Sequence, residues 1–161
     1  MAITRTGKAA EHYEKAEDFW NNDDYEKAIA EYGEVIKLLP NDAESYGGRG
    51  QCYNSLEQWD KALADLDKAI SLDSGNSDYY ALRGRVQAAL GKIEKGGADT
   101  DKAATLAPNQ AGRFYFVFGK LLEDAENNSE AAKYYKKSVS SGGSGNKFSD
   151  KAKEKLAALG M

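Results

Sequence analysis

Apolar and small residues recur at helical spacing in paired stretches of about 14 residues, and a short polar break separates the two members of each pair. The pattern returns every 34 residues: the segment 24–28 matches 58–62, and Pro40 recurs two periods later as Pro108. A repeat of this length predicts helical hairpins that stack on one another, because one hairpin alone cannot bury its apolar face. The expected helices are 8–21, 25–39, 42–55, 58–72, 76–90, 92–106, 110–125, 129–140 and 149–159.

The period divides the chain into an N-terminal extension, four repeat units and a last helix. Their boundaries are 1–8 for the extension, 9–42, 43–76, 77–111 and 112–145 for the units, and 146–161 for the last helix. One extra residue precedes the fourth unit and shifts its register. The Ser- and Gly-rich run 140–146 is typical of a flexible connection. The last helix is expected to cap the apolar edge of the fourth hairpin, as the ends of a solenoid require.

One position in every front helix holds a small residue, and the four are Ala16, Gly50, Gly84 and Gly119. A small residue there lets the back helix of the same hairpin pack closely. The third unit departs from the pattern in its back helix, where Gly96 and Thr100 replace an alanine and a large residue and Gly97 follows. This departure has two interpretations. The first is a close helix crossing at Gly84 and Gly96, and the second is a surface where a partner approaches the backbone or the array flexes.

The front helices also carry a longer motif of an aromatic residue, a glycine four residues later and a large residue after that. It appears as Tyr46-x-x-Arg49-Gly50-x-x-Tyr53, Tyr80-x-x-Arg83-Gly84-x-x-Gln87, Tyr115-x-x-Phe118-Gly119-x-x-Leu122 and, loosely, His12-x-x-Lys15-Ala16-x-x-Phe19. The back helices add Ala28 with Tyr32, Ala62 with Leu66, and Ala131 with Tyr135. On these residues, over about 9–145, the chain resembles the tetratricopeptide repeat (TPR) family. The resemblance implies an all-α, right-handed superhelical solenoid of four antiparallel helix pairs plus a C-terminal capping helix.

Front helices line the concave groove of proteins in this family. The resemblance therefore assigns nine residues to a peptide-binding groove: Tyr13, Glu17, Trp20, Gln51, Asn54, Arg85, Arg113, Phe116 and Lys120. The aromatic members could instead cover seams between helices. Arg85 is the strongest candidate, because it is central and because Ala81 and Ala89, one turn to either side, offer it no carboxylate. The mixed groove suits a peptide with apolar and acidic groups, and basic groups toward the acidic first unit.

Many family members that hold chaperone tails use a carboxylate clamp of lysine, asparagine and arginine side chains. The residues at the matching positions of this chain are Tyr13, Glu17, Gly48, Asp78 and Leu82. None of the five matches the clamp. We therefore expect a TPR chain without the carboxylate-clamp residues.

Composition and charge reduce the number of function classes that fit the chain. The chain has 161 residues, a net charge of −4, one cysteine and one histidine, so neither an internal disulfide nor a structural zinc site is expected. These features favour a cytoplasmic protein without a cofactor, and no apolar run is long enough to span a membrane. Residues 9–42 hold 3 basic and 10 acidic residues, a net −7, whereas 146–161 hold 4 and 2, a net +2. The lysines of the last helix make only a weak case for nucleic acid or a membrane surface.

No group of residues in the sequence points to catalysis. His12 falls at an internal position of the first front helix and is expected to pack there. Cys52 is expected to be a small buried residue rather than a reactive thiol. The acidic pairs 65/67 and 99/101 are expected on exposed helix surface, because a metal site needs several oxygen ligands around a tight loop.

The sequence thus favours a non-enzymatic scaffold that binds a protein or peptide in the groove of a TPR array. A second hypothesis follows from the uneven charge. The chain could be a self-assembling structural module, in which the acidic front of one copy meets the basic rear of another through head-to-tail or edge contacts and weak self-association.

Overall fold

The computed structural model describes residues 4–141 and 146–161. Within these residues the chain forms helices and no strand. The helices are α1 (Lys8–Asn21), α2 (Tyr25–Leu38), α3 (Ala43–Ser55), α4 (Trp59–Leu72), α5 (Ser77–Ala89), α6 (Ile93–Leu106), the 3-10 turn η1 (Pro108–Gln110), α7 (Ala111–Asp124), α8 (Asn128–Ser141) and α9 (Lys147–Ala158). Every predicted α-helix is present, and its ends agree within two residues.

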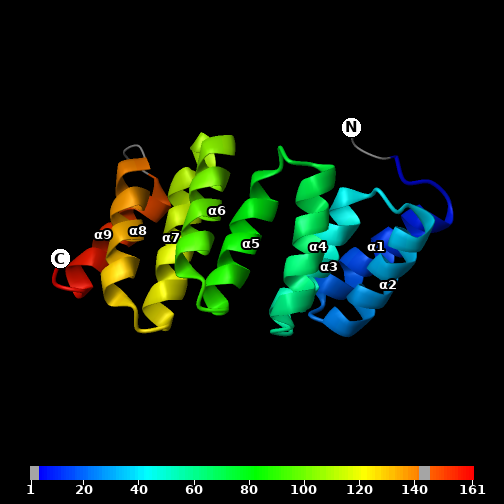
Figure 1. The fold of residues 1–161 in the computed structure, drawn as a ribbon, viewed down its shortest axis with the longest axis horizontal. Coiled ribbons are helices and arrows are strands. Elements are labelled where there is room, and N and C mark those ends of the chain that lie inside the picture. Colours follow the sequence, from blue (N-terminus) through cyan, green and yellow to red (C-terminus); the bar gives the residue numbers. More distant parts are fainter. Residues whose placement is uncertain (1–3, 142–145) are drawn as a thin grey trace.

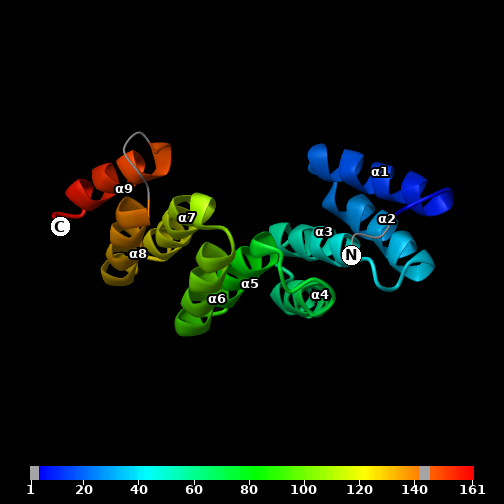
Figure 2. The ribbon, with the colours of Figure 1, turned by 90° about the horizontal axis from the view of Figure 1, so that it is seen from above.

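The helices form four hairpins, α1 with α2, α3 with α4, α5 with α6 and α7 with α8, that follow one another along the molecule (Figure 1). The row is curved. The odd-numbered helices α1, α3, α5 and α7 lie toward its hollow side, and the even-numbered partners lie on the outside (Figure 2). The predicted all-α helical solenoid is confirmed.

The predicted small residues lie where the two helices of a hairpin meet. A Cβ atom added to Gly50 would lie 3.1 Å from Cγ of Leu66. In the third hairpin the contact is closer, because a Cβ on Gly84 would lie 2.7 Å from the carbonyl oxygen of Gly96. The hydroxyl of Thr100 donates to that same carbonyl at 2.9 Å. Of the two interpretations of the third unit, the close crossing at Gly84 and Gly96 is confirmed.

Apolar residues are buried in separate clusters along the row, as expected when each hairpin contacts mainly its neighbours. One cluster joins the first hairpin to α3, a second joins α4 to α5, and a third joins α7 and α8 to α9. The buried members are Ala16, Ala28, Tyr32 and Cys52 in the first, Ala62, Leu66 and Val86 in the second, and Phe118, Leu122, Ala131, Tyr135 and Ala152 in the third. None of the described helices has the length and apolar character needed to cross a bilayer.

Helix α9 caps the array, as predicted. Ala152 is fully buried, and Leu156 and Leu159 pack on the cluster of α7 and α8. The side chain of Asn146 begins the helix by accepting a hydrogen bond from the backbone N–H of Phe148 at 2.9 Å. This helix therefore covers the apolar edge that the fourth hairpin would otherwise expose.

Two details differ from the expected layout. The extra residue before the fourth unit is taken up by η1 and by α7, which has 14 residues where α3 and α5 have 13. Helix α8 continues to Ser141, so the start of the expected flexible connection is helical. The rest of that prediction, 142–145, lies outside the described residues.

Candidate functional site

The hollow side of the array contains a groove of about 500 Å³, which draws side chains from all four hairpins. Six of the nine residues predicted for it line this groove: Tyr13, Glu17, Trp20, Gln51, Arg85 and Arg113. The structure therefore brings together residues that span 100 positions of sequence, from Tyr13 to Arg113. Asn54, Phe116 and Lys120 are not among the lining residues.

The groove has its floor on helix α3, where two adjacent glycines leave the backbone bare. A Cβ on Gly47 would lie 2.5 Å from Cε1 of Tyr79, and a Cβ on Gly48 would lie 2.5 Å from Cζ of Tyr32. These distances are shorter than atoms of folded proteins approach, so the two rings occupy the space that side chains would fill. The glycines thus let tyrosines from α2 and α5 pack closely against α3.

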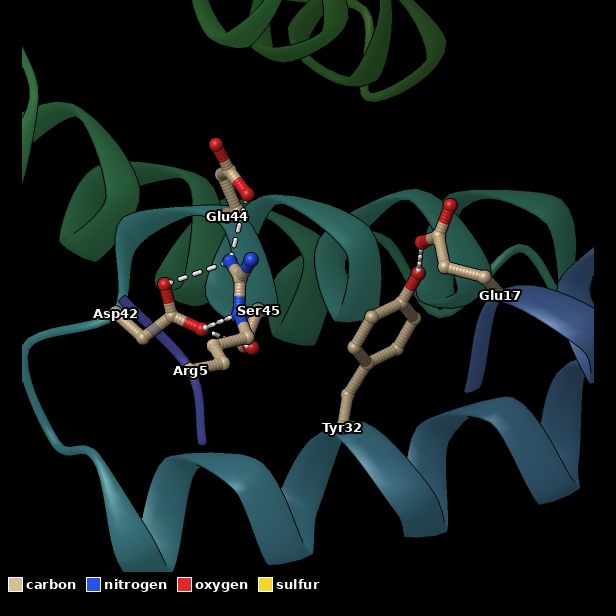
Figure 3. A network of polar contacts seen from close by, with 6 residues as sticks. All are labelled: Arg5, Glu17, Tyr32, Asp42, Glu44 and Ser45. Carbon is tan, nitrogen blue, oxygen red and sulfur yellow. Dashed lines mark hydrogen bonds and ion pairs between the residues drawn. The ribbon is translucent and has the colours of Figure 1, made fainter. Parts of the chain in front are cut away.

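One end of the groove is acidic and aromatic. Tyr32 donates its hydroxyl hydrogen to the carboxylate of Glu17 (Figure 3). Burial raises the pKa of Tyr13 to about 12, and the negative charge of Glu17 adds to the rise. Glu44 also lines this end. The end is formed by the first hairpin and the start of α3, in agreement with the predicted acidic first unit.

The other end of the groove is basic. Arg113 pairs with Asp78 at 2.7 Å and donates a second hydrogen bond to Gln110 at 2.7 Å. Arg85 forms no ion pair with any side chain of residues 4–141 and 146–161. Burial lowers the pKa of the Arg85 guanidinium, and the positive charge of Arg113 lowers it further. A partly desolvated cation without a carboxylate partner among the described residues therefore lines the groove at Arg85.

The predicted position of Phe116 requires a correction. Its ring packs on those of Tyr135, at 5.7 Å between centroids, and Phe148, at 5.8 Å. Phe148 belongs to α9, which contacts α7 as well as α8. The capping helix thus covers this part of the fourth front helix, and Phe116 lies in a seam, which was the alternative considered for the aromatic residues.

Lys120 and Asn54 also lie outside the groove lining. Lys120 is exposed and pairs with Asp124 one turn along α7 at 2.9 Å. Asn54 is partly buried in the last turn of α3. Both residues occupy repeat positions expected to face the groove, but neither is among the residues that line it.

Among the contributors to this surface that the choice of nine residues missed are two tyrosines and one arginine. Tyr32 and Tyr79 line the groove, and Arg5 contacts its acidic end. The adjacent glycines at 47 and 48 were a usable signal for the two rings, since bare backbone in a helix marks a close approach. No local pattern marks Arg5, whose partners lie 37 and 39 residues away.

The residues considered for catalysis or metal binding are held in contacts within the fold. The Nδ1 atom of His12 lies 2.6 Å from a carboxylate oxygen of Glu31. Cys52 is fully buried, as predicted, and burial raises the pKa of its thiol to about 12. Residues 4–141 and 146–161 hold no cluster of three or more potential metal ligands.

The curved row of helical hairpins with a lined hollow side defines a helical-repeat solenoid. Two models of the tetratricopeptide repeat family match the chain, over residues 13–77 and 112–141, which together exceed half its length. The chain belongs to the tetratricopeptide repeat family. It is therefore a scaffold of the kind that mediates protein–protein interaction.

Individual proteins resemble the chain over different lengths. Hsp70-Hsp90 organizing protein 3 of Arabidopsis thaliana is 40% identical over 48 residues, which are 30% of this chain and 9% of that protein. The crystal structure of MamA has a TM-score of 0.71 at 22% identity and covers 93% of this chain and 81% of MamA. The TPR2B domain of yeast Sti1, solved as a complex with pHsp70, has a TM-score of 0.63 at 23% identity over 83% of this chain and 97% of the domain. Both structures share the fold of this chain.

Proposed function

We propose that the chain is a non-enzymatic scaffold that binds an extended peptide segment in its groove. The observation that carries this proposal is Arg85, a partly desolvated arginine that lines the groove and has no carboxylate partner among the described residues. Burying a charge without a partner costs free energy, and a ligand carboxylate would recover that cost. The peptide accordingly carries an acidic residue opposite Arg85.

The remaining lining supports a ligand with apolar as well as charged groups. A volume of about 500 Å³ is in the range of ligand-binding pockets. The lining of the groove also includes apolar and aromatic surface from Leu82, Phe114 and Val117. The ligand therefore combines apolar side chains with its acidic group, while the acidic end of the groove favours a basic residue.

The relatives support a protein partner in general terms. The name of the plant relative describes an organizer of Hsp70 and Hsp90, and the yeast domain was solved with pHsp70. The five clamp positions of this chain hold other residues, with Glu17 and Asp78 in two of them. We therefore infer a peptide ligand that is not held by the family's carboxylate clamp. The single buried cysteine is consistent with our proposal of a cytoplasmic location.

A displayed library of random heptapeptides, selected on the wild-type chain, tests this function. We expect enriched peptides to contain Asp or Glu, and we expect Arg85→Glu to weaken their binding at least tenfold in a titration. Lys68→Glu is the matched control, because Lys68 is exposed on α4 and lies outside the groove. Both variants should melt close to wild type. Enrichment without acidic residues, or equal affinity for Arg85→Glu, would contradict the proposal.

Self-assembly is the second candidate function, and the uneven charge favours it. The first unit, 9–42, has a net charge of −7, and the capping segment 146–161 has +2. Exposed charges interact less as salt rises, because the screening length falls from about 10 Å at 0.1 M to about 3 Å at 1 M. Head-to-tail assembly would therefore give a mass by light scattering that falls with added salt, and a constant monomer mass would exclude it.

A further inference from the structure

Arg5 is held at the acidic end of the groove although it lies outside every helix. Its Nε and Nη2 atoms donate to the two carboxylate oxygens of Asp42 at 2.7 and 2.8 Å, and Nη2 also donates to Glu44 at 2.6 Å. The guanidinium carbon lies 3.7 Å from the centre of the Tyr13 ring. Figure 3 shows the guanidinium between the two carboxylates. The contacts satisfy both the charge and the flat shape of an arginine.

The partners of Arg5 form a built site. Asp42 is buried, and the hydroxyl of Ser45 donates to it at 2.5 Å, so its carboxylate is fixed before the arginine arrives. Tyr13 and Glu44 both line the groove. Burial alone would lower the pKa of Arg5, but the hydrogen bonds to Asp42 and Glu44 raise it. The site therefore stabilises a positive charge.

A second observation shows that this end of the groove has unused hydrogen-bonding capacity. Tyr79 lines the groove with only 8% of its surface exposed, and its hydroxyl has no hydrogen-bond partner among the described residues. Burial raises the pKa of this hydroxyl, and the negative charge of Glu44 raises it further. A buried hydroxyl without a partner is costly, and a bound ligand would remove that cost.

The segment that carries Arg5 is otherwise loosely attached. Its neighbours Thr4, Thr6 and Gly7 are exposed, whereas the Arg5 side chain is only 15% exposed. Gly7 has a φ of 54°, a left-handed conformation that turns the chain before α1 begins. Among residues 4–7, Arg5 is the one whose side chain is not exposed, so its contacts anchor this part of the segment.

We propose that the acidic end of the groove is a binding site for an arginine side chain, and that Arg5 fills it as an intramolecular ligand that competes with an arginine of a bound peptide. The competition with a peptide rests on the proposed function of the groove. The arginine site itself rests on Asp42, Glu44 and Tyr13. A ligand tethered by a short segment has an effective concentration in the millimolar range. A free arginine therefore binds the wild-type chain weakly and binds more tightly once Arg5 is removed.

The probe for this proposal is N-acetyl-arginine amide, titrated into the full chain and followed by amide NMR shifts of α1 and α3. We expect Arg5→Ala to bind it at least tenfold more tightly than wild type, and Arg5→Ala with Glu44→Gln to lose most of that gain. Lys8→Ala is the control for loss of a nearby positive charge, because Lys8 is exposed, and it should bind as wild type does. N-acetyl-citrulline amide, which has the same shape without the charge, should not bind.

Equal affinity of Arg5→Ala and wild type for the probe would overturn the proposal, and so would equal binding of the citrulline compound. If Arg5→Ala fails to fold, Arg5→Gln provides the same test with a polar side chain of similar reach. Replacing Lys68, which is exposed on α4 outside the groove, by Gln in the Arg5→Ala background should leave probe binding unchanged. Failure of the peptide selection together with success of the arginine titration would thus reject the proposed function and leave the arginine site intact.

Discussion

Arginine and aspartate face each other across the second and third hairpins, whereas two aromatic rings occupy the equivalent positions of the fourth. Arg49 binds Asp65 through two hydrogen bonds of 2.7 and 2.8 Å. Arg83 binds Asp99 with the same two distances. The fourth hairpin instead has Phe118 and Tyr134, with ring centroids 4.6 Å apart at 69°. In each case the partners are 16 residues apart.

The preceding hairpin explains the difference. Phe118 lies against Gly96, where an added Cβ would come within 3.1 Å of its ring, and the Tyr134 hydroxyl occupies the space above Gly97. The two glycines of α6 therefore provide a bare surface on which large rings can pack. Arg83 also pairs with Asp67 of the second hairpin at 2.6 Å. The counterpart of Asp67 one repeat later, Asp101, pairs instead with Lys137 at 2.7 Å. Chemistry at this position is set across the junction between repeats.

This comparison corrects the expectation for the acidic pairs. Asp65 and Asp99 were expected on exposed surface, but both are buried as partners of arginines. Asp67 is exposed, as predicted, and Asp101 is partly exposed. The residue before the motif glycine is arginine in these two hairpins, Arg49 and Arg83, so a buried aspartate is required to neutralise it.

The largest expected effect on stability comes from breaking one of the two arginine–aspartate pairs. Asp65→Leu leaves Arg49 partly buried without a carboxylate, which should lower the free energy of unfolding by about 3 kcal/mol. Adding Arg49→Leu should recover most of that loss, because an apolar pair of similar volume needs no compensating charge. Denaturant unfolding followed by far-UV circular dichroism measures both. A double variant as unstable as Asp65→Leu would show that packing, and not the unpaired charge, controls this position.

The next largest effect on stability is a difference between the second and third hairpins in their tolerance of alanine at the small position. Gly84→Ala places a methyl group 2.7 Å from a backbone oxygen that cannot move without shifting α6, so we expect a loss of about 2 kcal/mol. Gly50→Ala meets the flexible side chain of Leu66 at 3.1 Å, and the better helix propensity of alanine offsets the strain by up to about 1 kcal/mol.

Denaturant unfolding of the two glycine variants beside wild type measures the difference. A larger loss for Gly50→Ala than for Gly84→Ala would contradict the assignment of the backbone crossing to the third hairpin.

The helices and their pairing could be predicted because both depend on local patterns. The period of 34 residues, the polar breaks and the small residues at positions such as Gly50 and Gly84 each act within one hairpin. The crossing at Gly96 was predictable for the same reason. The buried state of Asp65 was not, because it depends on which residue of the facing helix reaches it.

The groove could be predicted where repeat geometry alone places a side chain, as for Tyr13 and Arg85. The prediction failed at Phe116, because Phe116 packs against α9, and α9 lies beyond the repeats. It also missed Arg5, which belongs to no repeat and reaches Asp42 across 37 residues. Repeat periodicity describes contacts that recur, so contacts made once by the two ends of the chain fall outside it.

The smallest expected effect concerns the turns within the hairpins, where one left-handed residue recurs in every repeat. These residues are Asp23, Glu57, Gly91 and Glu126, with φ of 59°, 56°, 75° and 59°. Only the third hairpin has glycine there, and a side chain in this conformation costs about 1 to 2 kcal/mol. A glycine avoids this cost, but its greater loss of conformational entropy on folding, about 0.5 to 1 kcal/mol, cancels part of the advantage.

Glu57→Gly should therefore stabilise the chain by about 0.5 to 1 kcal/mol, and Gly91→Ala should destabilise it by a similar amount. Both turns close with the same hydrogen bond of 2.8 Å, from Gln58 to Tyr53 and from Lys92 to Gln87, so the comparison isolates the left-handed residue. For a chain of this size we expect thermal midpoints to move by about 2 °C in opposite directions. A shift of the same sign in both variants would show that the charge of Glu57, and not its backbone conformation, determines the stability of the turn.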